Sequence, residues 1–170
     1  MKIKKSVLYL SVFVFIPFFI SVAYGEKVHR VIDGDTFILE NGQRVRMIGI
    51  DAPEIDNKKY KKIGEPFGVE SKLLLKQTIQ GKDVVLRSGK EPYDKYSRRL
   101  AYVFLEDETF VNRMMVRLGL AETFRRFPFK YKQEFLDLEY EAKQNKIGMW
   151  KDNRKPLSQK WKSFIKSFNR

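Results

Sequence analysis

Acidic side chains cluster in the segment RMIGIDAPEID, although the 170-residue chain carries a formal net charge of +13. Asp51, Glu54 and Asp56 lie within six residues of one another, and Asp35 follows an earlier tight turn. Carboxylates held close together repel and raise one another's pKa unless a cation lies between them. Because Ca²⁺ and Mg²⁺ take oxygen ligands, a hard divalent cation is one explanation. The other is that these are ordinary turn and cap residues, since Asp-Gly and Asp-x-Pro-Glu are common in loops.

Two arginines could extend such a site toward a phosphodiester. Arg46 lies five residues before Asp51 on the same expected strand, and Arg98 lies in YDKYSRR, an unusual place for a core residue. A guanidinium binds phosphate oxygens in a bidentate manner and stays charged in any site. Two arginines facing a metal-carboxylate cluster would suit a phosphodiester. For each arginine alone, a solvated surface charge is the simpler interpretation.

The residue types that the chain lacks narrow the chemistry. There is no cysteine, and His29 is the single histidine. This composition argues against zinc hydrolases with several His or Cys ligands, paired-histidine ribonucleases and cysteine nucleophiles. His29 is interpreted as a strand residue without a catalytic part. Carboxylates, arginines and lysines therefore remain for catalysis.

The acids and Arg46 lie in or beside an expected β-meander. The segment KVHRVIDGDTFILENGQRVRMIGID alternates apolar and polar residues around two turn signals, DGD and NG. This pattern predicts three strands, near residues 27–32, 35–40 and 43–50. If the ends of the second and third strands adjoin, three acids converge: Asp35, Asp51 and Glu54.

The rest of the chain predicts two more strands and three helices. Apolar residues at helical spacing predict a helix over residues 67–80, with an apolar stripe formed by Val69, Leu73, Leu74 and Ile79. DVVLR and RLAYVFL are expected strands, joined by the polar connection SGKEPYDKYSR. Further helices are expected over 111–118 and 130–145. Five strands with one inserted and two terminal helices indicate an α+β fold, a five-stranded OB-type β-barrel with about three helices packed on it.

The N-terminus is typical of an export signal. MKIKK precedes a run without charge from Ser6 to Gly25, and SVA offers the small-x-small pattern of a signal peptidase site. We expect residues 1–23 to be a cleaved signal peptide and the domain to be secreted or periplasmic. A retained N-terminal membrane anchor, with the domain outside the cytoplasm, is the alternative because such a span needs about 20 residues. Without cysteines, the exported domain rests on its hydrophobic core.

Most of the excess positive charge lies at the two ends. The leader carries +3 and residues 151–170 carry +6, which leaves only +4 for the expected domain over residues 24–150. In the tail, apolar residues recur at helical spacing between lysines: Trp161, Phe164, Ile165 and Phe168. This spacing leaves three interpretations of the tail: a helix packed on the barrel, an amphipathic helix that binds a polyanion or an anionic membrane, or a disordered segment. Lysines also crowd an expected exposed loop over residues 57–64.

Several motifs together resemble the thermonuclease, or staphylococcal nuclease, family. VIDGDTF, RVRMIGIDAPE and DKYSRRLAYVF follow one another in this order, closed by GLAE and IGMW, across residues 26–150. The resemblance implies a monomeric endonuclease with an OB barrel and a Ca²⁺ cofactor, which hydrolyses DNA and RNA to 3′-phosphate products with little sequence specificity.

The positions that match the family's motifs identify the site residues that the resemblance implies. The implied Ca²⁺ ligands are Asp35, Asp51 and the backbone carbonyl of Ala52. Glu54 would hold or deprotonate the attacking water, while Arg46 and Arg98 would clamp the phosphate and stabilise the five-coordinate transition state. Ala52 replaces a threonine of the best-known member, a change that a main-chain ligand should tolerate.

The implied nucleotide contacts depart further from the family pattern. Lys95 and Tyr96 match it, although a surface lysine and a turn residue are nearly as good an interpretation. Arg125 and Phe127 stand where the best-known member has two tyrosines. Phe127 could still stack a base and Arg125 could add a phosphate or stacking contact, so base preference stays open.

Two classes of function remain at this point. One is the Ca²⁺-dependent phosphodiesterase, and the other is an OB-fold module that binds single strands without cutting them. All five catalytic positions carry the required residue types, which favours the enzyme: Asp35, Arg46, Asp51, Glu54 and Arg98.

Overall fold

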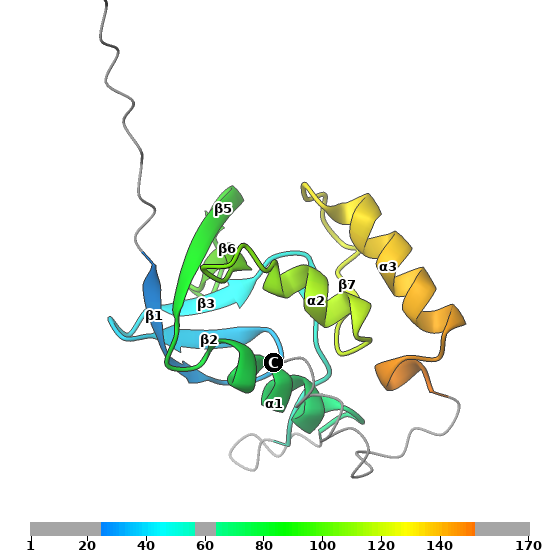
Figure 1. Cartoon of the computed structure of the whole chain (residues 1–170). Coiled ribbons are helices and arrows are strands. Elements are labelled where there is room, and N and C mark those ends of the chain that lie inside the picture. Colours follow the sequence, from blue (N-terminus) through cyan, green and yellow to red (C-terminus); the bar gives the residue numbers. More distant parts are fainter. Residues whose placement is uncertain (1–24, 57–63, 152–170) are drawn as a thin grey trace, which may run out of the picture.

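Five strands of the chain close into a β-barrel (Figure 1). The structure, a computed structural model, describes residues 25–56 and 64–151. The barrel order is β1-β2-β3-β6-β5. All neighbouring pairs are antiparallel except β3 and β6, which run parallel. The barrel strands are β1 Glu26–Val31, β2 Thr36–Leu39, β3 Arg44–Met47, β5 Asp83–Tyr93 and β6 Arg99–Phe104. The predicted OB-type α+β fold is confirmed.

Apolar side chains of the barrel strands fill the barrel interior. On β3, Val45 and Met47 are buried in the core. Because side chains alternate across a strand, Arg46 between them points away from the interior. The other strands supply further buried apolar side chains: Val28, Val31, Phe37, Leu39, Val84, Ala101 and Val103. The period-2 pattern that predicted the meander thus also places Arg46 on the outer face.

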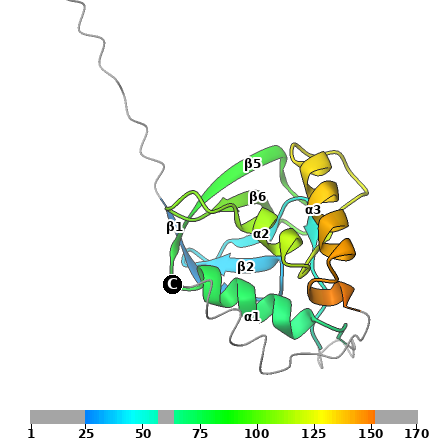
Figure 2. The same ribbon diagram turned by 45° about the vertical axis from the view of Figure 1, so that its right-hand side comes forward.

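The described residues form three α-helices, as expected from the sequence: α1 Gly68–Ile79, α2 Val111–Arg117 and α3 Lys132–Gln144. Helices α1 and α2 pack on barrel strands, and α3 packs on α2. Figure 2 shows α1 along one side of the barrel, with α2 between β6 and α3. A short 3₁₀ helix, η2 Gly148–Trp150, follows α3 and packs against it.

The buried face of α1 matches the expected one only in part: Leu74 and Ile79 are buried, but the other two residues of the predicted stripe are not. Val69 and Leu73, assigned to the apolar stripe by their spacing, are 57% and 38% exposed. Leu75 is buried instead, beside Ser71 and Thr78. The two hydroxyls tolerate burial because each donates to a backbone carbonyl, Ser71 to Leu120 at 2.6 Å and Thr78 to Leu74 at 2.8 Å. Apolar spacing alone could not identify a helix face that includes satisfied polar residues.

Strand β5 is longer than predicted. The expected strand ended at Arg87, but β5 continues through most of the supposed polar connection to Tyr93, which pairs with Arg99 of β6. The ladder is irregular between Ser88 and Tyr93. The added residues are mostly exposed, so the hairpin extends beyond the core without the apolar alternation that would have predicted it.

Two short strands outside the barrel were not predicted. The expected third strand ran to residue 50, but β3 ends at Met47 and the chain turns at Gly49, whose φ is +80°. After the turn, β4 Ile50–Asp51 pairs antiparallel with β7 Glu122–Thr123. The side chain of Asn112, on α2, donates from Nδ2 to the Ile48 carbonyl at 2.8 Å and so holds the turn. Asp51 therefore lies on a separate small sheet.

Several predictions fall outside the described residues: the leader, the lysine-rich segment over 57–63 and the tail beyond residue 151. They stay predictions. Over residues 25–56 and 64–151, the helices are too short or too polar for a membrane span.

Candidate active site

Asp35 lies at the start of β2 and is almost fully buried. Its Oδ2 accepts a hydrogen bond from the Ala52 amide at 2.8 Å, and its Oδ1 accepts one from the Thr36 hydroxyl at 2.9 Å. Its own amide donates to Oδ1 of Asp33 at 3.1 Å, which shapes the turn. The carboxylate is thus held in one orientation by bonds to two different segments.

Gly34 explains how these segments come so close. A Cβ placed on Gly34 would lie 2.5 Å from the Cβ of Ala52 and 2.6 Å from that of Ser71. No larger residue fits, because the turn before β2 contacts both the chain after β4 and helix α1. The glycine of the DGD motif therefore brings Asp35 against the Asp51–Ala52 segment.

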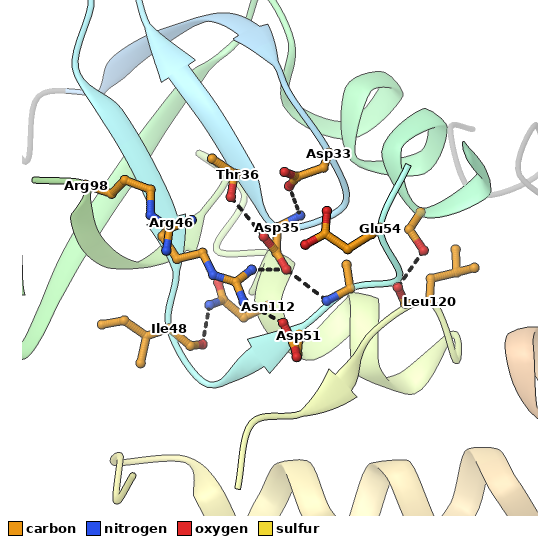
Figure 3. Close-up of polar contacts among 12 residues, drawn as sticks. Asp33, Asp35, Thr36, Arg46, Ile48, Asp51, Glu54, Arg98, Asn112 and Leu120 are labelled. Atoms are coloured by element: carbon orange, nitrogen blue, oxygen red, sulfur yellow. Dashed lines mark hydrogen bonds and ion pairs between the residues drawn. The ribbon is translucent and has the colours of Figure 1, made fainter. Parts of the chain in front are cut away.

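Arg46 bridges two carboxylates, one from the turn before β2 and one from β4. Its guanidinium forms an ion pair with Asp35 Oδ2, and its Nη2 lies 2.7 Å from Asp51 Oδ1 (Figure 3). The Arg46 side chain is only 15% exposed. Burial lowers the pKa of Arg46, while the Asp51 charge raises it. A guanidinium stays protonated under these conditions, so one cation lies between the two acids.

Glu54 completes the acidic side of the cluster. Its backbone is held by Glu65, whose amide donates to the Glu54 carbonyl at 2.8 Å and whose Oε2 accepts from the Glu54 amide at 3.1 Å. Figure 3 shows the Glu54 side chain directed toward Asp35. Asp51 and Glu54 are both exposed, so this edge of the cluster is open to solvent.

Arg98 lies at the end of the β5–β6 turn and pairs with Asp94. Its Nε donates to Asp94 Oδ2 at 2.7 Å, and its amide donates to Oδ1 at 3.0 Å. Burial tends to raise the pKa of Asp94, but hydrogen bonds from Arg98 and the Tyr96 amide outweigh it and lower the pKa. Figure 3 shows Arg98 extending toward Arg46, and its charge contributes to lowering the pKa of Arg46. The two arginines therefore border the same cluster.

Asp33 also lies at the cluster, although the sequence marked it only as a turn residue. Burial raises its pKa, and the nearby charge of Arg46 offsets part of that effect. Figure 3 shows its carboxylate beside Asp35. The repeated aspartate of DGD was the available signal. It could not show that both side chains turn to the same face of the protein.

The cluster offers oxygen ligands but does not form a complete set of metal-binding side chains. Among the described residues, no group of three acidic or histidine side chains is arranged to hold a metal ion. Asp35 and Asp51 nevertheless converge on a single positive group, the Arg46 guanidinium. Two carboxylates and a nearby main-chain carbonyl, that of Ala52, are hard donors that suit Ca²⁺. The donor set therefore fits the predicted metal.

The predicted nucleotide contacts fall in two places. Tyr96, in the β5–β6 turn, is 67% exposed; Lys95 Nζ lies 4.9 Å from its ring centroid and Arg98 Cζ 5.4 Å. Phe127, in the loop after β7, is 59% exposed. Both rings are accessible and lie beside cationic groups, a combination typical of surfaces that stack unpaired bases.

Arg125 is directed into the protein's own hydrogen-bond network. Its Nη2 donates to Glu139 Oε1 at 2.7 Å, and its Nη1 donates to the Thr123 carbonyl at 3.0 Å. Burial would raise the pKa of Glu139, but hydrogen bonds from Arg125, Lys143 and Thr123 lower it to about 2. The sequence did not reveal this buried acid, because a glutamate within a charged helix pattern has no distinguishing signal.

Comparison with known proteins decides the family. The model of the staphylococcal nuclease homologue domain matches residues 44–152. This chain belongs to the staphylococcal nuclease family. A thermonuclease of Staphylococcus hyicus is 37% identical over 128 residues, which cover 73% of this chain and 74% of that protein. An uncharacterized endonuclease of Escherichia coli is 34% identical over 134 residues, covering 74% and 76%. An uncharacterized protein of Methanocaldococcus jannaschii is 32% identical over 149 residues, covering 75% and 72%.

Proposed function

We propose that this chain is a Ca²⁺-dependent endonuclease that hydrolyses DNA and RNA to 3′-phosphate products. Family membership makes it a nuclease, a hydrolase of phosphodiester bonds. The convergence of Asp35 and Asp51 on Arg46 supports the more specific statement. It combines hard oxygen donors and a phosphate-binding guanidinium in one place, which is what a phosphodiester and a dication require together.

In this proposal Asp35, Asp51 and the Ala52 carbonyl hold Ca²⁺. A bound Ca²⁺ supplies a Lewis acid that polarises a phosphoryl oxygen. The Asp35 carboxylate is oriented for this role by the Ala52 amide and the Thr36 hydroxyl. Asp51 is exposed on β4, so its carboxylate can adjust to a ligand without disturbing the barrel core.

The remaining roles belong to side chains around that position. Arg46 and Arg98 present planar donor groups that bind phosphate oxygens and stabilise the added negative charge of the transition state. Glu54 holds or deprotonates the attacking water, and its backbone is fixed by Glu65 so that the carboxylate faces the cluster. Fixed donors are effective because little reorganisation is needed when charge develops.

The contacts in this proposal carry little sequence information. Arginines recognise phosphates, and Lys95, Tyr96 and Phe127 offer charge and stacking surfaces rather than base-edge hydrogen bonds. Phosphate contacts position a strand, and stacking is tolerant of sequence. We therefore propose little sequence specificity. Export of a monomeric domain, and contact of the basic tail with a polyanion or anionic membrane, complete the proposal.

Hydrolysis with and without Ca²⁺ tests this function. Plasmid DNA and a single-stranded RNA are each incubated with the full chain in Ca²⁺ and in EGTA. Digestion only in Ca²⁺, with 3′ ends that a polymerase extends only after phosphatase treatment, supports the proposal. A gel shift without digestion would instead support the non-catalytic OB-fold binding module.

Matched variants connect the activity to the site. Asp51→Asn should abolish most of the hydrolysis, whereas Asp137→Asn, an exposed change on α3, should not affect it. Equal activity of the two variants would contradict the assignment of Asp51. Calorimetric titration with Ca²⁺ provides a second measurement, because Asp51→Asn should also weaken binding of the cation.

A further inference from the structure

Two neighbouring arginines in the loop between β7 and α3 have opposite environments. Arg125 is engaged by Glu139 and by the Thr123 carbonyl. Arg126 is exposed, and in the described part of the chain its guanidinium has no carboxylate partner and lies 5.6 Å from the ring centroid of Phe127. We propose that Arg126, and not Arg125, is this loop's cationic contact with a single-stranded nucleic acid, and that Phe127 beside it stacks on a base. The inference rests on the proposed function.

Arg125 is unavailable because Glu139 needs it. Glu139 is about 1% exposed and takes hydrogen bonds from Arg125 at 2.7 Å and Lys143 at 2.6 Å. Moving Arg125 to a phosphate would remove one of the charges that compensate a buried carboxylate. The Arg125 side chain is half exposed, but the Glu139 carboxylate is buried, so withdrawing the arginine would leave that buried charge less compensated and destabilise the fold. Arg126 can turn toward a phosphate without breaking any such pair.

The loop is attached close to the acidic cluster at both of its ends. The amide of Phe124 donates to the Gly49 carbonyl at 2.9 Å. The ring of Phe129 packs against the same glycine, where a Cβ would lie 2.5 Å from the ring. Gly49 precedes Asp51 by two residues, at most about 7 Å along the chain. The residues between the anchors, which include Arg126 and Phe127, therefore project from beside Asp51. An OB-type domain covers roughly 4–16 nucleotides, so one strand can span both places.

The loop also holds Phe127 in an exposed position. Lys132 Nζ donates to the Arg125 carbonyl at 2.7 Å and to the Phe127 carbonyl at 3.4 Å. The Phe124 ring supports the Phe127 ring from one side, with centroids 5.9 Å apart. A ring that is already held outward loses little conformational entropy when a base stacks on it. An exposed ring beside a free guanidinium matches the alternating bases and phosphates of an unpaired strand.

A matched pair of variants tests the proposal: Arg126→Gln and Arg125→Gln remove the same charge from adjacent positions. Binding of the full chain to a fluorescein-labelled oligothymidylate is followed by anisotropy in EDTA over a series of NaCl concentrations. Arg126→Gln should weaken binding and reduce the slope of log affinity against log salt by about 0.7, the value for one lost phosphate contact on a single strand. Arg126→Lys should restore the slope. Arg125→Gln should keep the slope and lower the melting temperature.

The aromatic partner has its own expected result. Phe127→Ala should weaken single-strand binding by roughly 5- to 150-fold, the range for loss of one stacked base, and should weaken duplex binding less. Three outcomes would overturn the proposal. Two are an unchanged salt slope in Arg126→Gln and a reduced salt slope in Arg125→Gln. The third is that Arg126→Gln weakens binding to phosphatidylserine vesicles but not binding to the oligothymidylate. Because binding is measured without Ca²⁺, failure of hydrolysis in the wild-type protein would contradict the proposed function without producing any of these three outcomes, so the two failures are distinguishable.

Discussion

Replacing Glu139 by glutamine should destabilise the domain in a strongly pH-dependent way. The Glu139 side chain is about 1% exposed and accepts hydrogen bonds from three groups. These are the Thr123 amide at 3.0 Å, Arg125 at 2.7 Å and Lys143 at 2.6 Å. Glutamine keeps the size of the side chain but removes its charge. Both cations then lose their common partner, and the link from α3 to β7 is weakened.

The magnitude follows from the pKa. The folded protein holds the pKa of Glu139 at about 2, against an ordinary value of 4.5. Each pKa unit corresponds to about 1.4 kcal/mol, so ionisation of Glu139 stabilises the fold by about 3 kcal/mol. Arg125 and Lys143 are half exposed, and water screens part of their attraction. We therefore expect a loss of about 2–3 kcal/mol in Glu139→Gln at neutral pH.

The sign of the pH dependence is determined by the lowered pKa. A carboxylate whose pKa is lower in the folded state stabilises the protein fully above its unfolded pKa, here 4.5. The contribution is lost as the pH falls toward 2. The difference between Glu139→Gln and the wild type should therefore shrink from pH 7 to pH 3.

Urea unfolding at pH 7 and pH 3 measures both quantities. Glu141→Gln, an exposed change on the same helix, is the control and should alter the free energy of unfolding by less than about 0.5 kcal/mol. A loss in Glu139→Gln that is the same at both pH values would refute the reasoning. It would mean that packing, rather than the charge, accounts for the effect.

Three further predictions concern the active site and the tail. Arg98→Ala should lower turnover by roughly 10²–10³-fold while the calorimetric affinity for Ca²⁺ stays nearly constant, and a mild loss would contradict its role. Arg46→Met should lower the free energy of unfolding without Ca²⁺ by on the order of 3 kcal/mol, because Asp35 stays buried without its partner. Added Ca²⁺ should recover part of that loss in thermal unfolding, and no recovery would contradict a cation site between Asp35 and Asp51. Deleting residues 151–170 should flatten the salt dependence of nucleic-acid binding at unchanged turnover, whereas failure to fold would favour a packed tail.

The sequence alone determined the fold class and the residue types of the candidate site. Turn signals such as DGD and NG, together with apolar alternation, act over a few residues, so the meander could be predicted before any contact was known. The motif around Asp51 and Arg98 likewise predicted the family. In the structure, the same alternation accounts for the buried Val45 and the outward Arg46 of β3, because the period of a strand is local.

Only the tertiary structure decided which groups face one another. Asp35 lies in the turn before β2 and Asp51 in the separate β4–β7 sheet, and their meeting at Arg46 depends on the turn at Gly49 and the close contact at Gly34. The small β4–β7 sheet pairs Ile50 with Thr123, 73 positions apart along the chain, which no local pattern encodes. Two adjacent arginines, Arg125 and Arg126, cannot be distinguished by the sequence pattern around them. They differ because the buried carboxylate of Glu139, on the following helix α3, pairs with Arg125 and not with Arg126, and burial of that carboxylate makes the pairing costly to break.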